Sequence, residues 1–242
     1  MIFVLGAACG GKSSFINAVA GDEYARLDDV EPLYKFFKAD ELAQSNPKLF
    51  QYFIKQNNLE KFYPDKNAAY SVADPSGGYR VTNPVVLDHV LELTAKQVGE
   101  GRKYIVEFSR GADSEYMEAF DVKADEIYQR SVGEIIRNIP AGFAVSSLVV
   151  NIFAGFDNRL QRNRERRRQG GHFVSEGSME TMYRADVFQF DRQDKNNGFF
   201  VCEGIKIPVY SFENAETGNP SALKPIFLKH YENALRFYRM CR

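Results

Sequence analysis

Short segments rich in apolar residues recur along the chain, and the segments between them carry helical patterns. A continuous apolar run such as residues 2–5 is typical of a buried strand. We predict strands at residues 2–5, 23–27, 103–108, 144–153 and 209–212, with a further short strand at 199–202. Strands that alternate with helices form βαβ units, which build a parallel sheet covered on both faces. The pattern therefore predicts an α/β fold of three layers around a five-stranded, mostly parallel sheet.

The predicted helices follow from apolar spacing and from the residues that begin or end them. We expect them at 12–20, 31–39, 40–59, 83–98, 113–138, 156–168, 178–190 and 222–240. Pro47 interrupts one helical stretch, Asn83 caps the next helix, and Gly99 ends it. Residues 60–83 carry no clean period, so we expect an insertion at about 40–83 that covers the site within a single domain of 242 residues.

Composition and charge restrict the class of protein. With 44% hydrophobic and 26% charged residues the chain is ordinary for a globular domain, and its formal charge of −1 argues against nucleic acid as the main partner. No apolar run approaches the roughly 18 residues of a membrane span. Because Cys9, Cys202 and Cys241 lack C-x-x-C spacing, we expect a cytoplasmic protein without a disulfide framework or a zinc site.

The first predicted strand runs directly into a glycine-rich motif. Gly6, Gly11, Lys12 and Ser13 fit G-x-x-x-x-G-K-[ST], the pattern of a phosphate-binding loop, with a strand before it and a helix after it. Glycines let several backbone N–H groups point at one anion, the lysine adds a cation for the outer phosphates, and the serine hydroxyl can hold magnesium. The residues expected to contact the nucleotide here are Gly6, Ala7, Ala8, Cys9, Gly10, Gly11, Lys12, Ser13 and Ser14.

Charged residues follow two other strands, and ligands of parallel sheets bind at the carboxyl ends of strands. After the second strand, Asp28 and Asp29 are candidates to bind an acceptor substrate, or they cap the helix that follows. Glu107 is costly to bury unless it is paired or used, which favours a base or metal ligand over a structural ion pair with Arg110 or Lys12. The planar guanidinium of Arg110 suits a substrate phosphate or carboxylate.

The predicted helix at 156–168 is rich in arginine and contains no lysine. Arg159, Arg162 and Arg166 are spaced three and four residues apart and therefore share one face. Such a charged run is often only a solvated face, and RNA binding is another use of an arginine-rich helix. Arginine is, however, well suited to clamp the oxygens of a transferring phosphoryl group.

We interpret residues 156–190 as a lid. Gly170 and Gly171 break the basic helix and would let it move as a unit. Arg167 and Arg168 lie on other faces of the helix, so we expect them to be largely solvated.

In the order of these parts the chain resembles the P-loop kinases of the nucleoside and nucleoside-monophosphate kinase type. The resemblance rests on GAACGGKS, on acids after the second strand (LDD) and in the third (VEFSRG), on the arginine-rich segment RLQRNRERRR and on the last strand, IPVYSF. It covers most of the chain. Deoxynucleoside kinases carry Glu-Arg-Ser where this chain has Glu107-Phe108-Ser109-Arg110, and the insertion at 40–83 has no counterpart in the family.

The resemblance implies a three-layer P-loop kinase-like fold with a lid, and the use of ATP and Mg²⁺. It implies catalytic roles for four residues, Lys12, Glu107, Arg162 and Arg166. It also implies that Ser13 and Glu107 hold the metal, and that the loop from Asn214 to Thr217 lies beside adenine. We therefore expect transfer of the γ-phosphoryl group of ATP to a hydroxyl or phosphate of a small-molecule acceptor.

Two alternatives belong to other classes of protein. Residues 74–77 fit D-x-x-G, a motif of GTPases, but no apolar strand precedes them and the chain lacks N-K-x-D for guanine. A regulatory ATPase, or a nucleotide-binding module without a small-molecule acceptor, would share the phosphate loop. A kinase has to exclude water when it closes over ATP, so the expected lid is the feature that separates the two.

Overall fold

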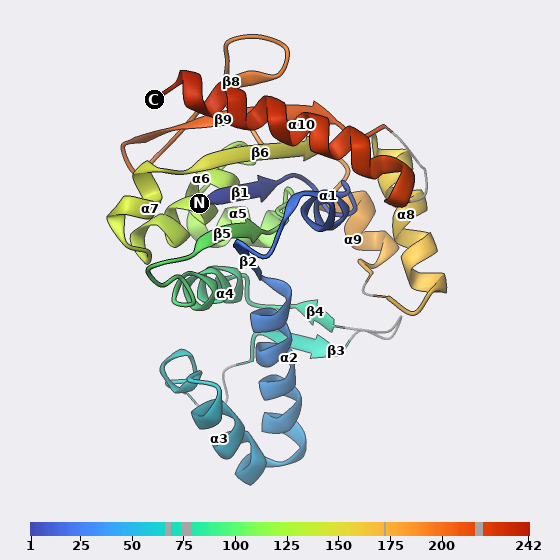
Figure 1. The fold of residues 1–242 in the computed structure, drawn as a ribbon. Helices are drawn as coiled ribbons and strands as arrows, with labels where there is room; N and C mark the ends of the chain where they lie inside the picture. The colour runs from blue at the N-terminus through green and yellow to red at the C-terminus, as the bar shows by residue number, and fades with distance from the viewer. Residues whose placement is uncertain (66–68, 74–78, 172, 216–219) are drawn as a thin grey trace.

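A β-sheet lies at the centre of the computed structural model, which describes residues 1–65, 69–73, 79–171, 173–215 and 220–242 (Figure 1). The strands of this sheet are β1 (Ile2–Leu5), β2 (Tyr24–Asp28), β5 (Lys103–Glu107), β6 (Leu148–Phe153), β7 (Asp191–Arg192), β8 (Asn197–Cys202) and β9 (Ile205–Glu213). They lie side by side in the order β2-β5-β1-β6-β9-β8-β7. The pairs from β2 through β9 are parallel, which agrees with the predicted βαβ pattern.

The expected number of five strands is wrong, because the sheet has seven. β8 pairs antiparallel with β9, and β7 pairs antiparallel with β8. Both residues of β7 are exposed, so no apolar pattern marks that strand in the sequence. The antiparallel pairs extend the sheet at the edge remote from β2, away from the phosphate loop.

Helices cover both faces of the sheet. On one face, α1 (Lys12–Val19) and α10 (Pro220–Met240) bury Phe15, Ile16 and Phe227 against β1 and β6. On the other face lie α4 (Val85–Ala95), α6 (Ile127–Arg137) and α7 (Ala141–Val145). The helix expected at 113–138 is broken near Asp121, as predicted, into α5 (Ser114–Phe120) and α6. Among the helices of the described chain, none combines the length and the apolar character that a bilayer crossing requires.

Two predicted elements have different bounds in the structure. The strand expected at 144–153 begins at Leu148, because the residues before it form α7, and the Ser147 hydroxyl closes that turn by donating to the Phe143 carbonyl. The helix expected at 178–190 is α9 (Glu176–Thr181), which ends much earlier. Beyond its end, the carbonyls of Tyr183 and Arg184 accept hydrogen bonds from a buried arginine side chain of α8 (Phe156–Arg168).

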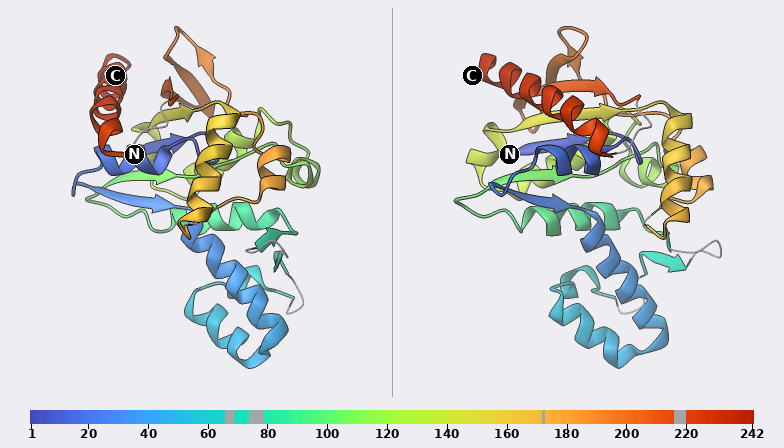
Figure 2. Two further views of the ribbon diagram at one scale, coloured as in Figure 1. Left: turned by 90° about the vertical axis from the view of Figure 1, so that its right-hand side faces the viewer. Right: turned by 45° about the vertical axis from the view of Figure 1, so that its right-hand side comes forward.

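The segment from α2 (Val30–Ser45) to α4 builds a hydrophobic core of its own. It contains α3 (Pro47–Gln56), the short helix η1 (Glu60–Phe62) and the two-stranded sheet of β3 (Ser71–Ala73) and β4 (Tyr79–Val81). Asp40 is buried within it and accepts hydrogen bonds from the Tyr63 hydroxyl, the Tyr70 amide and the Ser71 hydroxyl. α2 and α3 extend away from the central sheet (Figures 1 and 2). Pro47 separates the two helices, as predicted.

Candidate functional site

The phosphate-loop motif connects β1 to α1 at the carboxyl edge of the parallel strands. Gly6 and Gly11 have φ values of 133° and 102°, a region that favours glycine. A Cβ atom at Gly6 would lie 2.1 Å from the Ile152 carbonyl oxygen, and one at Gly11 would lie 2.2 Å from Nδ2 of Asn214. The motif therefore needs glycine at these positions for both its backbone conformation and its close packing.

The Lys12 side chain folds back onto this loop. Its Nζ donates to the carbonyls of Gly6 and Ala7, each at 2.9 Å, and to the hydroxyl of Ser109 at 2.6 Å. The side chain is only 4% exposed, and this burial lowers its pKa, although the charge of Glu107 opposes the shift. Lys12, which is expected to contact a phosphate, is therefore folded into the loop and lies beside Ser109, two residues after the end of β5.

The sequence predicted that Ser13 and Glu107 act together, and the structure brings them into contact. The Ser13 hydroxyl donates to Oε1 of Glu107 at 2.7 Å. Oε2 of the same carboxylate is paired with Arg26 at 2.7 Å, not with the Lys12 or Arg110 partners considered from the sequence. Sequence reasoning missed Arg26. A charged residue near the end of a predicted strand, two positions before Asp28, was the signal that could have identified it.

Asp28 and Asp29 are adjacent, but they have different partners. Oδ1 of Asp28 accepts from the amides of Val30 and Glu31, so this side chain caps the start of α2. Oδ2 of Asp29 instead pairs with Arg110 at 2.8 Å. Burial raises the pKa of the Asp29 carboxyl, and the neighbouring Arg110 guanidinium opposes the shift.

Arg110 is not available as the substrate clamp that the sequence suggested. Its Nε donates to the Ser131 hydroxyl, one terminal nitrogen donates to Asp29 and to the Ser109 carbonyl, and the other donates to the Leu87 carbonyl. The side chain is 4% exposed. In this arrangement Arg110 holds Asp29 in place.

The arginines of α8 have different environments. Arg162 donates to the carbonyls of Cys9 and Gly10, each at 3.3 Å, and so lies against the phosphate loop. Arg166 is half-buried and lines the cavity beside that loop. Arg167 and Arg168 are exposed, as predicted.

Arg159 does not reach the phosphate loop, although it shares a helix face with Arg162. It is 2% exposed, and its guanidinium donates to the carbonyls of Ala154, Tyr183 and Arg184. It therefore joins α8 to the segment that follows α9. Asn163 joins α8 to the segment that precedes α9, because its side chain exchanges hydrogen bonds with the backbone of Val174.

Asn214 follows β9 and lies behind the phosphate loop. Its Nδ2 donates to the Gly10 carbonyl at 2.9 Å, and its own carbonyl accepts from Arg162. Residues 216 and 217 of the loop predicted to lie beside adenine are outside the described residues. The D-x-x-G motif at 74–77 also lies outside them.

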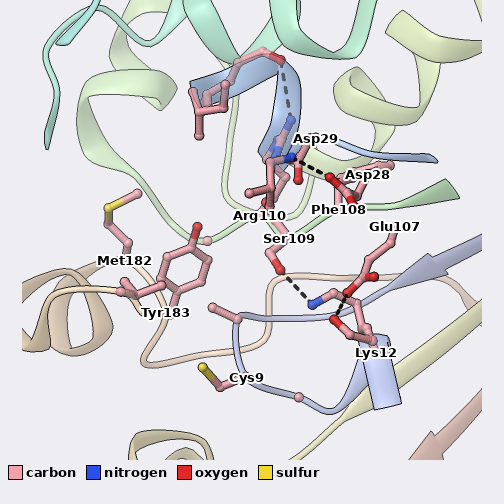
Figure 3. A pocket seen from close by; sticks show the side chains of 18 of the residues that line it. Cys9, Lys12, Asp28, Asp29, Glu107, Phe108, Ser109, Arg110, Met182 and Tyr183 are labelled. Atoms are coloured by element: carbon pink, nitrogen blue, oxygen red, sulfur yellow. Dashed lines mark hydrogen bonds and ion pairs between the residues drawn. The ribbon is translucent and has the colours of Figure 1, made fainter. Parts of the chain in front are cut away.

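A cavity of about 720 Å³ opens beside these groups (Figure 3). One part is lined by the phosphate loop with Lys12, Ser13 and Glu107. The other part is lined by Asp29, and by side chains that sequence reasoning did not single out, Leu33, Leu87, Asp113, Tyr116, Ile127, Met182 and Tyr183. Val81 also lines it, so the predicted covering segment contributes to the wall of the cavity through β4.

Comparison with known proteins gives little further information about this site. The chain matches no protein-family model and no curated protein sequence. Among solved structures it is similar to a presumed kinase from Chloroflexus aurantiacus, with 13% identity, coverage of 96% of each chain and a TM-score of 0.43. The function of this chain is therefore inferred from its own site.

Proposed function

We propose that this protein is a magnesium-dependent ATP kinase with a small-molecule acceptor. The observation that carries the proposal is the single cavity lined by Lys12 of a phosphate-loop motif and, in its other part, by the buried carboxylate of Asp29. A module that only bound or hydrolysed ATP would have no need for a second buried carboxylate beside the phosphates. A kinase needs a group there to take the proton of its acceptor.

ATP binds with its phosphates in the loop from Gly6 to Ser13. Backbone amides of the loop and the N-terminus of α1 surround the phosphates, since a helix N-terminus favours negative charge. Lys12 can exchange its hydrogen bonds to the loop carbonyls for the outer phosphates, because its Nζ already lies at the rim of the cavity. Arg166 supplies a further cation from α8.

Magnesium would be held by Ser13 and Glu107. The two side chains present oxygen atoms 2.7 Å apart, and oxygen donors are the ligands that this cation prefers. When bound, the cation neutralises charge on the β- and γ-phosphates of ATP. Arg26 orients the Glu107 carboxylate toward Ser13 through its ion pair with the second oxygen.

Asp29 accepts the proton of the acceptor. The acceptor oxygen forms a bond to the γ-phosphorus, the bond from that phosphorus to the β–γ bridging oxygen breaks, and ADP leaves with the bond's electron pair. Arg110 keeps one carboxylate oxygen of Asp29 in place during this step. The raised pKa of Asp29 suits a base that has to capture and release a proton.

The proposed lid, residues 156–190, excludes water from the transfer. Its helix α8 lies against the phosphate loop through Arg162, and residues Phe173, Val174, Met182 and Tyr183 of the same region line the cavity. The insertion at 40–83 contributes the opposite wall through Val81. Closure of these two segments would limit wasteful hydrolysis of ATP.

A metabolite panel tests the proposal. The wild-type protein is incubated with Mg-ATP and single small molecules, and ADP formation is measured against the Lys12→Ala variant. We expect slow hydrolysis alone and a many-fold increase with one class of acceptor. ADP formation that responds to a protein or a nucleic acid, and to no small molecule, would instead identify a regulatory ATPase.

A further inference from the structure

We propose that the acceptor is an alcohol that carries no phosphate group, and that the hydroxyl of Tyr183 and the carboxylate of Asp29 recognise it. This inference rests on the proposed kinase function and chooses between the two acceptor classes, hydroxyl and phosphate, which that function leaves open. It is based on the charged groups that line the cavity and on the polar groups there to which no other described residue hydrogen-bonds.

Arg110 is the cation at the acceptor end of the cavity, and its side-chain nitrogens already donate to groups of the protein. Arg110 distributes its donors over Asp29, the Ser131 hydroxyl and the carbonyls of Ser109 and Leu87. A phosphate that captured Arg110 would leave the Asp29 carboxylate unpaired, and the Asp29 side chain is only 15% exposed. An unpaired buried carboxylate beside a phosphate dianion is strongly unfavourable.

The other cations that line the cavity belong to its phosphate-loop end. Arg26 is paired with Glu107, and Lys12 is bonded within the loop. Arg166 lines the cavity together with residues of the phosphate loop. Arg26, Lys12 and Arg166 can neutralise the phosphates of ATP. Among the described residues that line the cavity, no further cation is then left to bind a second phosphate.

The acceptor end instead offers groups that suit an alcohol. No other described residue hydrogen-bonds to the Tyr183 hydroxyl or to Oδ1 of Asp29, and both side chains line the cavity. Burial raises the pKa of Tyr183 to about 12, so its hydroxyl is a neutral donor and acceptor at neutral pH. Leu33, Leu87 and Ile127 provide an apolar surface for the body of the acceptor.

Tyr183 is held firmly enough to select a substrate. Arg159 binds its carbonyl, and the adjacent Ala112 amide donates to the Met182 carbonyl at 2.7 Å. The residue opposite is Gly111, where a Cβ atom would lie 2.4 Å from the Met182 carbonyl oxygen and 2.9 Å from the Tyr183 ring. Glycine therefore permits this close packing, and Tyr183 and Asp29 line the same cavity (Figure 3).

Matched pairs of compounds test the inference. Nucleosides, sugars and aromatic alcohols are each compared with their own phosphate monoesters as acceptors, with saturating Mg-ATP and with ADP formation as the readout. We expect turnover with an alcohol and not with its monoester. Turnover with a monoester in preference to its alcohol would overturn the inference and leave the kinase function intact, whereas failure to bind Mg-ATP at all would overturn the kinase function.

The Tyr183→Phe variant tests the recognition step. It removes one hydrogen bond to the acceptor, so we expect KM for the alcohol to rise about tenfold with KM for ATP unchanged. Tyr52→Phe on α3 is the matched control, because the Tyr52 side chain is largely exposed and remote from the cavity lining. An unchanged acceptor KM in Tyr183→Phe would exclude this residue from recognition.

Inorganic phosphate provides a readout that needs no knowledge of the acceptor. Calorimetric titration should detect phosphate at the loop, and Lys12→Ala should weaken that binding strongly, because it removes the cation of the phosphate-loop motif and leaves Arg166 beside it. A phosphate site that survives in Lys12→Ala and disappears in Arg110→Lys would place a phosphate at the acceptor end, which would overturn the inference.

Discussion

The Ser13 hydroxyl donates a hydrogen bond to Oε1 of Glu107 at 2.7 Å, across 94 positions of sequence. This contact is possible because β5 lies directly beside β1, so that the end of one strand faces the first turn of α1. This contact makes the pair the proposed metal site. A metal-binding role for Glu107 and a purely structural one lead to different predictions.

Glu107→Gln should preserve ATP binding but lower turnover by a factor of about a hundred or more, because the amide cannot replace a metal-orienting carboxylate. The measurements are ATP affinity and kcat as a function of magnesium concentration. Arg26→Gln is the matched control, because it removes the ion pair and keeps the carboxylate. If both variants lose stability equally and keep their turnover, Glu107 is a structural ion, and the metal is not held by Ser13 and Glu107.

Lys12→Ala should abolish most of the increase in melting temperature that Mg-ATP causes in the wild-type protein. Ligand that binds only the folded state raises the free energy of unfolding, so the shift reports binding directly. Lys55→Ala is the control, since Lys55 is exposed on α3. A wild-type melting curve that millimolar Mg-ATP leaves unmoved would contradict nucleotide binding altogether.

Arg162→Lys and Arg166→Lys should lower kcat more than they weaken ATP binding, because lysine cannot offer two parallel donors to charge that develops during transfer. Arg167→Lys and Arg168→Lys should have little effect, as both side chains are exposed. The comparison is made at saturating ATP. Equal losses in all four variants would mean that α8 acts only as a positive surface, which would favour an RNA-contacting or regulatory role.

Arg159→Ala should destabilise the fold by about 3 kcal/mol or more, because it removes a buried side chain and three carbonyls lose their charged donor. The free energy of unfolding in urea measures this change. Arg168→Ala, an exposed position of the same helix, should leave it unchanged. If Arg159→Ala unfolds no more easily than Arg168→Ala, α8 is not joined to the Tyr183 segment in solution.

The acid limb of kcat/KM should lie above the ordinary pKa of aspartate, roughly 3.9, because burial raises the pKa of Asp29 and the base has to be deprotonated. Arg110→Gln removes the charge that opposes this shift, so the limb should move to higher pH, and Arg110→Lys should move it less. Asp28→Asn should leave the limb in place, since Asp28 caps α2. If the acid limb of kcat/KM lies at the same pH in the Arg110 variants as in the wild type, another group is the base.

The same shift has a defined sign for stability. A raised pKa favours the protonated carboxyl in the folded state, so the contribution of Asp29 to the free energy of unfolding decreases as pH rises from its ordinary pKa through its raised one. In Asp29→Asn this decrease should be absent, and denaturant unfolding at a series of pH values measures it.

Much of the framework was predictable from sequence because it depends on local pattern. The run from β1 through the phosphate-loop motif to α1 needs only an apolar strand, glycines where φ is positive, and a helix start. The break of α2 and α3 at Pro47 and the bounds of α8 likewise follow from neighbouring residues. Patterns of this kind also located the ends of the strands, and hence the edge of the sheet where charged residues gather.

The partners of those charged residues were decided only by tertiary structure. The lateral order of β2, β5 and β1 pairs Arg26 with Glu107 and Arg110 with Asp29, and nothing within any one of these segments specifies that order. Arg159 of α8 donates to the Tyr183 carbonyl, beyond the end of α9, and therefore does not reach the phosphate loop. The Tyr183 side chain lines the cavity. The sequence by itself located the predicted phosphate-binding motif, because that motif depends on consecutive residues. Which side chains remain free to meet an acceptor depends on contacts between distant segments, and only the folded chain specifies these.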